Sequence, residues 1–291
     1  MRVKIVASIA FVFFLLACGV LATPAPQVDT VSTMVAATEQ ALTASAPTVA
    51  PTPSGITSSF QNVSIVIPNG LASGAQAQQV AAVGDQGGAP WEVGPAHVTM
   101  TLTDYVAARD GFLQPTIYVY PASEYAAANP GAANSLPRLK TIIANPSTPL
   151  THDTLPIVPF FNADQIIATQ TGMVNFKTGS GVRVVAEYAQ GVGPISNEGL
   201  MYHYEGLTTD GKYYVIVLLP INAPFLSSSS DPSVQPPAGG IPFPDLNSTD
   251  PSVFEKYYQD VTDKLNATSP NAFQPNLNTL DALVQSIFVT P

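Results

Sequence analysis

The sequence predicts an α+β fold in which an antiparallel sheet packs against two C-terminal helices. Four runs between residues 168 and 220 alternate apolar and polar residues with the two-residue period of strands, and turn signals separate them. Two segments near the C-terminus instead carry apolar residues at helical spacing. Because these helices follow the strands and do not alternate with them, the pattern favours an α+β domain over a doubly wound parallel sheet.

The folded domain is expected to span residues 59–291, and its first half supplies the outer strands. The segment FQNVSIVIP is predicted to be the first strand, and a loop rich in Gly, Ala and Gln is expected to follow through Gly94. HVTMTLT (97–103) and PTIYVYP (115–121) are predicted to be strands. Two short helices are expected at SEYAAANP and LPRLKTIIAN, each ended by an Asn.

The central meander comprises the segments TGMVNFK, VRVVAEY, LMYHYEGL and KYYVIVLLP. The dipeptide Asp210-Gly211 is expected to join the last two strands, because it readily adopts the positive backbone angles of a tight hairpin. A two-residue loop at this point places Glu205 opposite Ile216 and His203 opposite Leu218.

A long exposed loop, residues 227–245, is predicted to separate the sheet from the C-terminal helices. Asp250 is expected to cap the first helix, with Pro251 in its first turn. The second helix is predicted from six apolar residues at helical spacing, namely Leu277, Leu280, Leu283, Val284, Ile287 and Phe288.

The N-terminus has the features of a signal peptide over residues 1–17. Two basic residues, Arg2 and Lys4, precede an uncharged run that is too short to span a membrane. The string LLACG that follows resembles the lipobox of bacterial lipoproteins, in which a small residue precedes a cysteine that becomes lipidated. This resemblance implies lipid attachment at Cys18 and a location on the extracytoplasmic face of the cell membrane.

Plain secretion is the alternative, because Val20 to Ala22 also form an acceptable small-residue cleavage site before Thr23. Three N-glycosylation tripeptides, at Asn62, Asn247 and Asn266, would suit a eukaryotic secreted protein. Under either interpretation, residues 18–58 are expected to form an Ala/Thr/Pro-rich tether.

The charge of the chain limits the classes of partner that it can bind, and its cysteine content limits how it can be stabilised. The net charge is -10, and removal of residues 1–17 takes away two basic residues and no acidic one, which gives -12. So acidic a chain is a poor candidate for binding nucleic acid. Cys18 is the only cysteine, so the exported domain has no disulfide and depends on its core for stability. The expected partners are the membrane, through the lipid anchor, and a protein or glycan ligand; no cofactor is expected.

The common catalytic and metal-binding motifs are absent from the sequence. It contains no G-x-S-x-G, H-E-x-x-H, P-loop or G-x-G-x-x-G arrangement, so no catalytic residue is assigned. DLNSTD (245–250) begins like a calcium loop, but Asp250 replaces the required glycine and Lys256 stands where a carboxylate is needed. The three histidines, at 97, 152 and 203, are too scattered to predict a metal site.

The most notable polar cluster is His203 and Glu205, which strand alternation places on one face. They are candidate ligand-binding residues, because an imidazole and a carboxylate among aliphatic side chains perturb each other. The simpler interpretation is that this face is exposed or lies at an edge. Arg183 and Glu187 are candidates for cross-strand ion pairs with the cluster.

Trp91, the only tryptophan, lies in the glycine- and proline-flanked segment GGAPWEVGP. It is a third candidate ligand-binding residue, although a plug over one end of the core is the competing interpretation. The sequence thus predicts a noncatalytic, membrane-anchored domain that binds a ligand or a partner. The alternative is an extracytoplasmic hydrolase that uses His203 with Glu205 or His152 with Asp153.

Overall fold

The computed structural model describes residues 54–85, 89–109, 113–151 and 154–290, and the chain from Pro53 to Pro291 forms one compact unit. The expectations for the signal peptide, for Cys18 and for most of the tether therefore lie outside the described residues. Within the described residues, no helix is both long enough and apolar enough to cross a membrane.

The fold is α+β, and its centre is a seven-stranded antiparallel sheet in the order β3-β4-β5-β9-β8-β7-β6. The predicted meander forms the last four of these strands. The strands are β3 (Gly74–Val80), β4 (His97–Thr103), β5 (Thr116–Pro121), β6 (Asp164–Phe176), β7 (Gly179–Ala189), β8 (Met201–Thr208) and β9 (Tyr213–Pro220).

The turn chemistry of the sequence fixes the register of the central hairpin. Gly211 has a φ of 74° in the turn between β8 and β9, where only a residue without a Cβ adopts that angle at little cost. As predicted, Glu205 pairs with Ile216 and His203 pairs with Leu218.

A second, three-stranded antiparallel sheet joins the two ends of the described chain. Strands β1 (Gly55–Phe60) and β2 (Val63–Pro68) form a hairpin, and β10 (Phe288–Val289) adds to the other side of β2. The Val66 N–H also donates to Ser286 Oγ at 2.8 Å. The C-terminus therefore completes a structure that the N-terminal hairpin begins.

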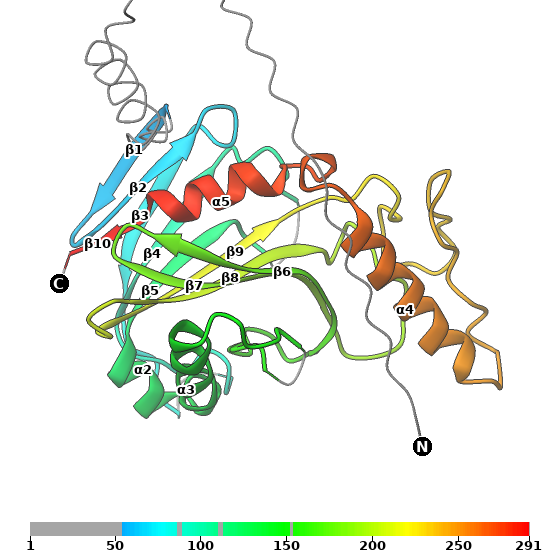
Figure 1. Ribbon diagram of the computed structural model, residues 1–291, viewed down its shortest axis with the longest axis horizontal. Coiled ribbons are helices and arrows are strands. Elements are labelled where there is room, and N and C mark those ends of the chain that lie inside the picture. Colours follow the sequence, from blue (N-terminus) through cyan, green and yellow to red (C-terminus); the bar gives the residue numbers. More distant parts are fainter. Residues whose placement is uncertain (1–53, 86–88, 110–112, 152–153, 291) are drawn as a thin grey trace, which may run out of the picture. The chain divides into compact units, whose positions relative to one another are not determined.

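The helices divide between the two faces of the large sheet (Figure 1). Helices α4 (Ser252–Ala267) and α5 (Leu277–Ser286) lie on one face, with α5 between the large sheet and β2. Helices α2 (Ala122–Ala128) and α3 (Pro130–Ala144) cover the opposite face. A short 3₁₀ turn, Pro270–Ala272, joins α4 to α5.

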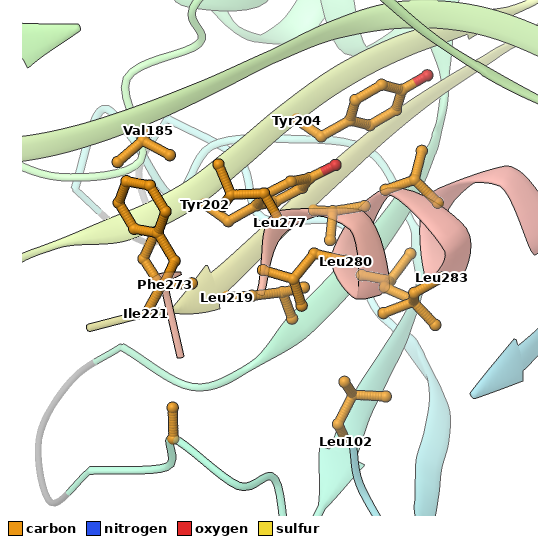
Figure 2. Close-up of a cluster of buried hydrophobic side chains, with 14 of the residues drawn as sticks. Leu102, Val185, Tyr202, Tyr204, Leu219, Ile221, Phe273, Leu277, Leu280 and Leu283 are labelled. Carbon is orange, nitrogen blue, oxygen red and sulfur yellow. The ribbon is translucent and has the colours of Figure 1, made fainter. Parts of the chain in front are cut away.

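Each face of the large sheet has its own apolar core. On the α5 face, leucines of the helix point at Tyr202 and Leu219 of the central strands (Figure 2). The opposite core joins Leu136, Leu139 and Ile142 of α3 to the strands beneath. The prediction that both C-terminal helices pack against the sheet is confirmed.

Several boundaries differ from those predicted. Strand β1 begins at Gly55, before the expected start of the domain at Ser59. A turn with Gln61 at φ 51° splits the predicted first strand, so that Phe60 ends β1 and the rest of the segment forms β2. Part of the predicted Gly/Ala/Gln loop is strand β3, an edge strand whose pairing with β4 overrides its weak strand propensity. Phe288 lies in β10, 40% exposed, and does not extend the helical stripe.

Helix α3 begins earlier than predicted, at Pro130. The Asn129 side chain accepts a hydrogen bond from the Ala132 N–H at 3.1 Å, and Pro130 follows in the first turn, where its missing N–H costs nothing. The weak apolar pattern of residues 130–135 conceals this start in the sequence. The loop at residues 227–245 forms no helix or strand, as predicted.

Candidate ligand-binding site

His203 and Glu205 lie in the middle of the sheet, each 1% exposed. The interpretation that their face is exposed or lies at an edge is therefore wrong. Strand β8 is flanked by β7 and β9, and helix α3 packs over β7 and β8. The part of α3 that supplies the cover was itself predicted as a helix (136–145), but no local pattern indicates which face of the sheet it packs against.

The Glu205 carboxylate is surrounded by hydrogen-bond donors. Its Oε1 accepts from the Val158 N–H at 2.6 Å and contacts His203 Nε2 at 3.1 Å, while Tyr214 donates its hydroxyl to Oε2. Three partners of this kind satisfy a carboxylate that would be costly to bury alone.

Tyr188 extends this network by one more hydrogen bond. Its hydroxyl lies 2.8 Å from His203 Nδ1 and also accepts from Gln165 Nε2 at 3.3 Å. If Nε2 of His203 carries the proton shared with Glu205, then Nδ1 is an acceptor and the Tyr188 O–H donates to it. Every group in the network then has a complementary partner.

Burial and charge keep both phenols of the network protonated. Burial raises the pKa of the Tyr188 hydroxyl, and the nearby Glu205 charge raises it further. The same two causes raise the pKa of Tyr214. The network therefore supplies neutral phenols and contains no tyrosinate that could act as a nucleophile.

A cleft of about 600 Å³ opens beside this network. Its lining includes six aromatic side chains: Trp91, Tyr118, Tyr120, Phe160, Phe161 and Tyr188. They come from the segment before β4, from β5, from the segment before β6 and from the end of β7. Tyr188 belongs to both features, so the cleft and the buried network form one site.

The aromatic rings of the cleft pack against one another. Tyr118 and Phe160 have ring centroids 5.0 Å apart, and Phe161 and Tyr188 have theirs 5.4 Å apart. These contacts restrict the motion of the four rings in the lining of the cleft.

Tyr120 is held on both sides at the back of the cleft. It stacks on His97 with the centroids 4.1 Å apart and on Tyr125 of α2 with the centroids 4.0 Å apart. His97 Nδ1 also contacts the Pro95 carbonyl oxygen at 3.0 Å, and burial lowers the pKa of its imidazole. His97 therefore packs against Tyr120, one of the lining rings.

The polar groups of the cleft are mostly uncharged. Gln114, Asn162 and Gln190 add amide side chains to the lining, and Glu92 adds a carboxylate. Among the described residues, no Lys, Arg or His lines the cleft. The described lining therefore combines aromatic rings with amides and carries one negative charge.

Trp91 is half-buried in this lining, so it contributes to the cleft instead of only closing the core. The sequence did not reveal its aromatic neighbours. Tyr118 and Tyr120 alternate along β5, which is the one signal that points to a shared aromatic face, whereas Phe160 and Tyr188 reach the cleft only through the tertiary fold.

The other predicted polar groups lie elsewhere. Arg183 and Glu187 project from the opposite face of the sheet, so the predicted ion pairs with His203 and Glu205 do not form. Arg183 instead pairs with Asp281 of α5 at 2.6 Å. His152 and Asp153 lie outside the described residues.

Comparison with known proteins adds no family. No family model matches the chain, and no curated protein or solved structure matches it either. Among the described residues, no group of three or more His, Cys, Asp and Glu side chains is placed to hold a metal ion. Functional inference therefore rests on the aromatic cleft and on the network behind it.

Proposed function

We propose that this chain is an exported, noncatalytic binding protein that takes a small-molecule ligand in the aromatic cleft. The observation that carries the proposal is the set of six aromatic side chains that line a cleft of ligand size together with three amide side chains. Binding sites for small molecules are typically concave and largely apolar, with a few polar groups that orient the ligand.

The proposal includes anchoring to the extracytoplasmic face of a membrane through a lipid on Cys18. This part is supported by the basic start, the uncharged run and the LLACG string of the sequence. A domain held at the membrane by a tether suits capture of ligands that diffuse outside the cell.

Ligand-observed NMR with the full chain tests the binding role. We expect members of at least one class of water-soluble neutral, cationic or anionic small molecules to bind saturably. Replacing the cleft residue Ala163 with Trp should abolish binding by filling the space, whereas Phe288→Ala, remote from the lining, should leave it unchanged. Binding that survives Ala163→Trp, or no binding by any class, would contradict the proposal.

A hydrolase is the second candidate, because Tyr188, His203 and Glu205 form a continuous hydrogen-bonded series that reaches the cleft. A nucleophile, a base and an orienting carboxylate are arranged in this order in several hydrolases. The raised pKa of Tyr188 opposes this role, since a phenol that stays protonated is a poor nucleophile. Turnover of chromogenic esters, glycosides or peptides that is lost in His203→Ala would favour the hydrolase.

A further inference from the structure

We infer that the cleft recognises a neutral saccharide and that Tyr188 helps to set this specificity through a fixed phenol oxygen. This inference rests on the proposed binding function and names the chemical class of its ligand. It rests on two observations. The cleft is lined by aromatic rings, amide groups and one carboxylate, and Tyr188 is hydrogen-bonded to the buried network.

The aromatic lining suits the apolar face of a sugar ring. Pyranose rings carry patches of C–H groups that pack on aromatic faces, while their hydroxyls point outward. Tyr118 and Phe160 have centroids 5.0 Å apart, and Tyr118 and Tyr120 have theirs 6.2 Å apart. These three rings pack against one another, whereas the rings of an aromatic cage stand apart around a quaternary ammonium.

The lining charge excludes acidic ligands. In the part of the chain that the structure describes, no Lys, Arg or His side chain lines the cleft, and Glu92 contributes a negative charge. A phosphate, carboxylate or sulfate in this cleft would lose its hydration without gaining a cationic partner. Neutral hydroxyls meet no such penalty. The cleft is lined by Gln114, Asn162 and Gln190, and a side-chain amide can both donate and accept hydrogen bonds.

The network behind Tyr188 determines what its oxygen offers a ligand. With the proton of neutral His203 on Nε2, where it meets the Glu205 carboxylate, Nδ1 is an acceptor and the Tyr188 O–H points inward to it. Gln165 Nε2 donates to the same phenol oxygen. The group can then only accept a further hydrogen bond, so it favours a ligand hydroxyl over a ligand carbonyl. Tyr188 acts here as a specificity-determining residue, and His203 and Glu205 act as positioning residues.

The single tryptophan makes the test direct, because all indole emission of this chain comes from a residue of the cleft. The full chain should be held in a polyoxyethylene detergent, since the headgroup of an alkyl glycoside is itself a saccharide. Emission is then titrated with cellohexaose, maltohexaose and chitohexaose. Hexagalacturonate and benzyltrimethylammonium serve as the anionic and cationic comparisons.

We expect at least one neutral hexasaccharide to shift the Trp91 emission saturably and both charged probes to fail. Tyr118→Ala should weaken the binding about tenfold or more, as the loss of a stacking surface implies. Tyr188→Phe keeps the ring and removes the acceptor, so it should weaken binding about three- to tenfold. Phe288→Ala is the matched aromatic control outside the cleft and should bind as the parent does.

The inference is overturned if none of the three neutral hexasaccharides binds, or if Tyr118→Ala binds them like the parent. Should the charged probes bind while the neutral ones fail, the cleft remains a ligand site and only the saccharide class is wrong. A Tyr188→Phe variant with unchanged affinity would remove Tyr188 from the recognition step.

Discussion

Two buried carboxyl groups, Glu205 and Glu187, show how the same residue type is accommodated differently on the two faces of one sheet. Glu205 receives hydrogen bonds from Val158 N–H, His203 and Tyr214. Glu187 accepts one from the Ser196 N–H at 3.0 Å, and burial raises its pKa to about 8. We therefore expect Glu205 to affect stability through its hydrogen-bond partners, and Glu187 to make stability depend on pH.

Glu205→Gln should lower the free energy of unfolding by about 2–3 kcal/mol. The amide replaces an acceptor by a donor, and a donor cannot satisfy the hydrogen-bond donors that meet the carboxylate. Urea denaturation of the full chain measures the change. Glu92→Gln, at an exposed carboxylate of the cleft, is the control and should change stability by less than about 0.5 kcal/mol. Equal stability of the Glu205→Gln variant and the parent would show that the network contributes nothing to folding.

Glu187 makes stability depend on pH. Burial raises its folded-state pKa above the ordinary 4.5 to about 8, against the lowering effects of the Ser196 hydrogen bond and the Arg109 charge. The protonated form is thus favoured by folding, so its stabilising contribution is complete below about pH 4.5 and is lost as pH rises to about 8. Glu187→Gln should remove this dependence and gain roughly 3–5 kcal/mol relative to the parent between pH 5 and pH 9.

Urea midpoints of the full chain at the two pH values test this expectation, with Glu92→Gln again as the control. A parent and a Glu187→Gln variant whose stabilities change in parallel with pH would contradict it.

The pairing of residues could be predicted, but their burial could not. The Asp210-Gly211 turn fixed which residues face each other across the hairpin, including His203 and Leu218. Whether that face is covered depends on where α2 and α3 pack, and the local pattern that predicts a helix does not indicate which face of a sheet it covers. The aromatic cleft was hidden for the same reason, because its members are brought together only by the packing of loops against strand ends.

At the scale of elements, α5 contributes to packing on two sides. Its buried residues contact the large sheet and the small sheet at once, and five apolar side chains of this region are fully buried: Leu277, Leu280, Leu283, Val284 and Ile287. Each such side chain contributes roughly 1.5–3 kcal/mol when buried. The sum is comparable to the 5–15 kcal/mol by which typical domains are stable, although chain ordering offsets much of it.

A chain that ends at Ser269 should therefore be insoluble or lack a cooperative thermal transition. The truncation removes α5 and β10 and exposes the apolar part of the central sheet that α5 covers, although α4 remains on that face. Circular dichroism during heating and dye binding to exposed apolar surface measure the outcome. Phe288→Ala in the full chain is the control, because that side chain is 40% exposed and its loss should be tolerated. A soluble truncated chain with a sharp transition would show that α5 belongs to a separate module.

For the molecule as a whole, the amino-acid composition bears on how the chain would attach to a membrane. Only 10 of the 291 residues are basic, so electrostatic attraction to anionic lipids is a poor means of attachment for the chain. A covalent lipid would supply attachment without basic residues, since two acyl chains suffice for stable anchoring.

Cys18→Ser should move the protein from the membrane fraction to the medium. The change removes the thiol that the proposed lipid requires and leaves the charge of the chain the same. Immunoblots of fractionated cells measure the partition, and mass spectrometry of the mature N-terminus identifies any lipid. Equal partition of the variant and the parent, or a mature chain that starts at Thr23, would contradict anchoring.

The pairing of β2 with β10 also bears on when the protein can fold. Val66 and Ser286, which share a hydrogen bond, are 220 residues apart in the sequence, and the small sheet is complete only when β10 pairs with β2. Contacts between distant parts of a chain form slowly, because a long loop must close first. A nascent chain cannot complete its core until its last residues have been made. We therefore expect the precursor to remain unfolded through synthesis, which is the state that a secretion channel accepts.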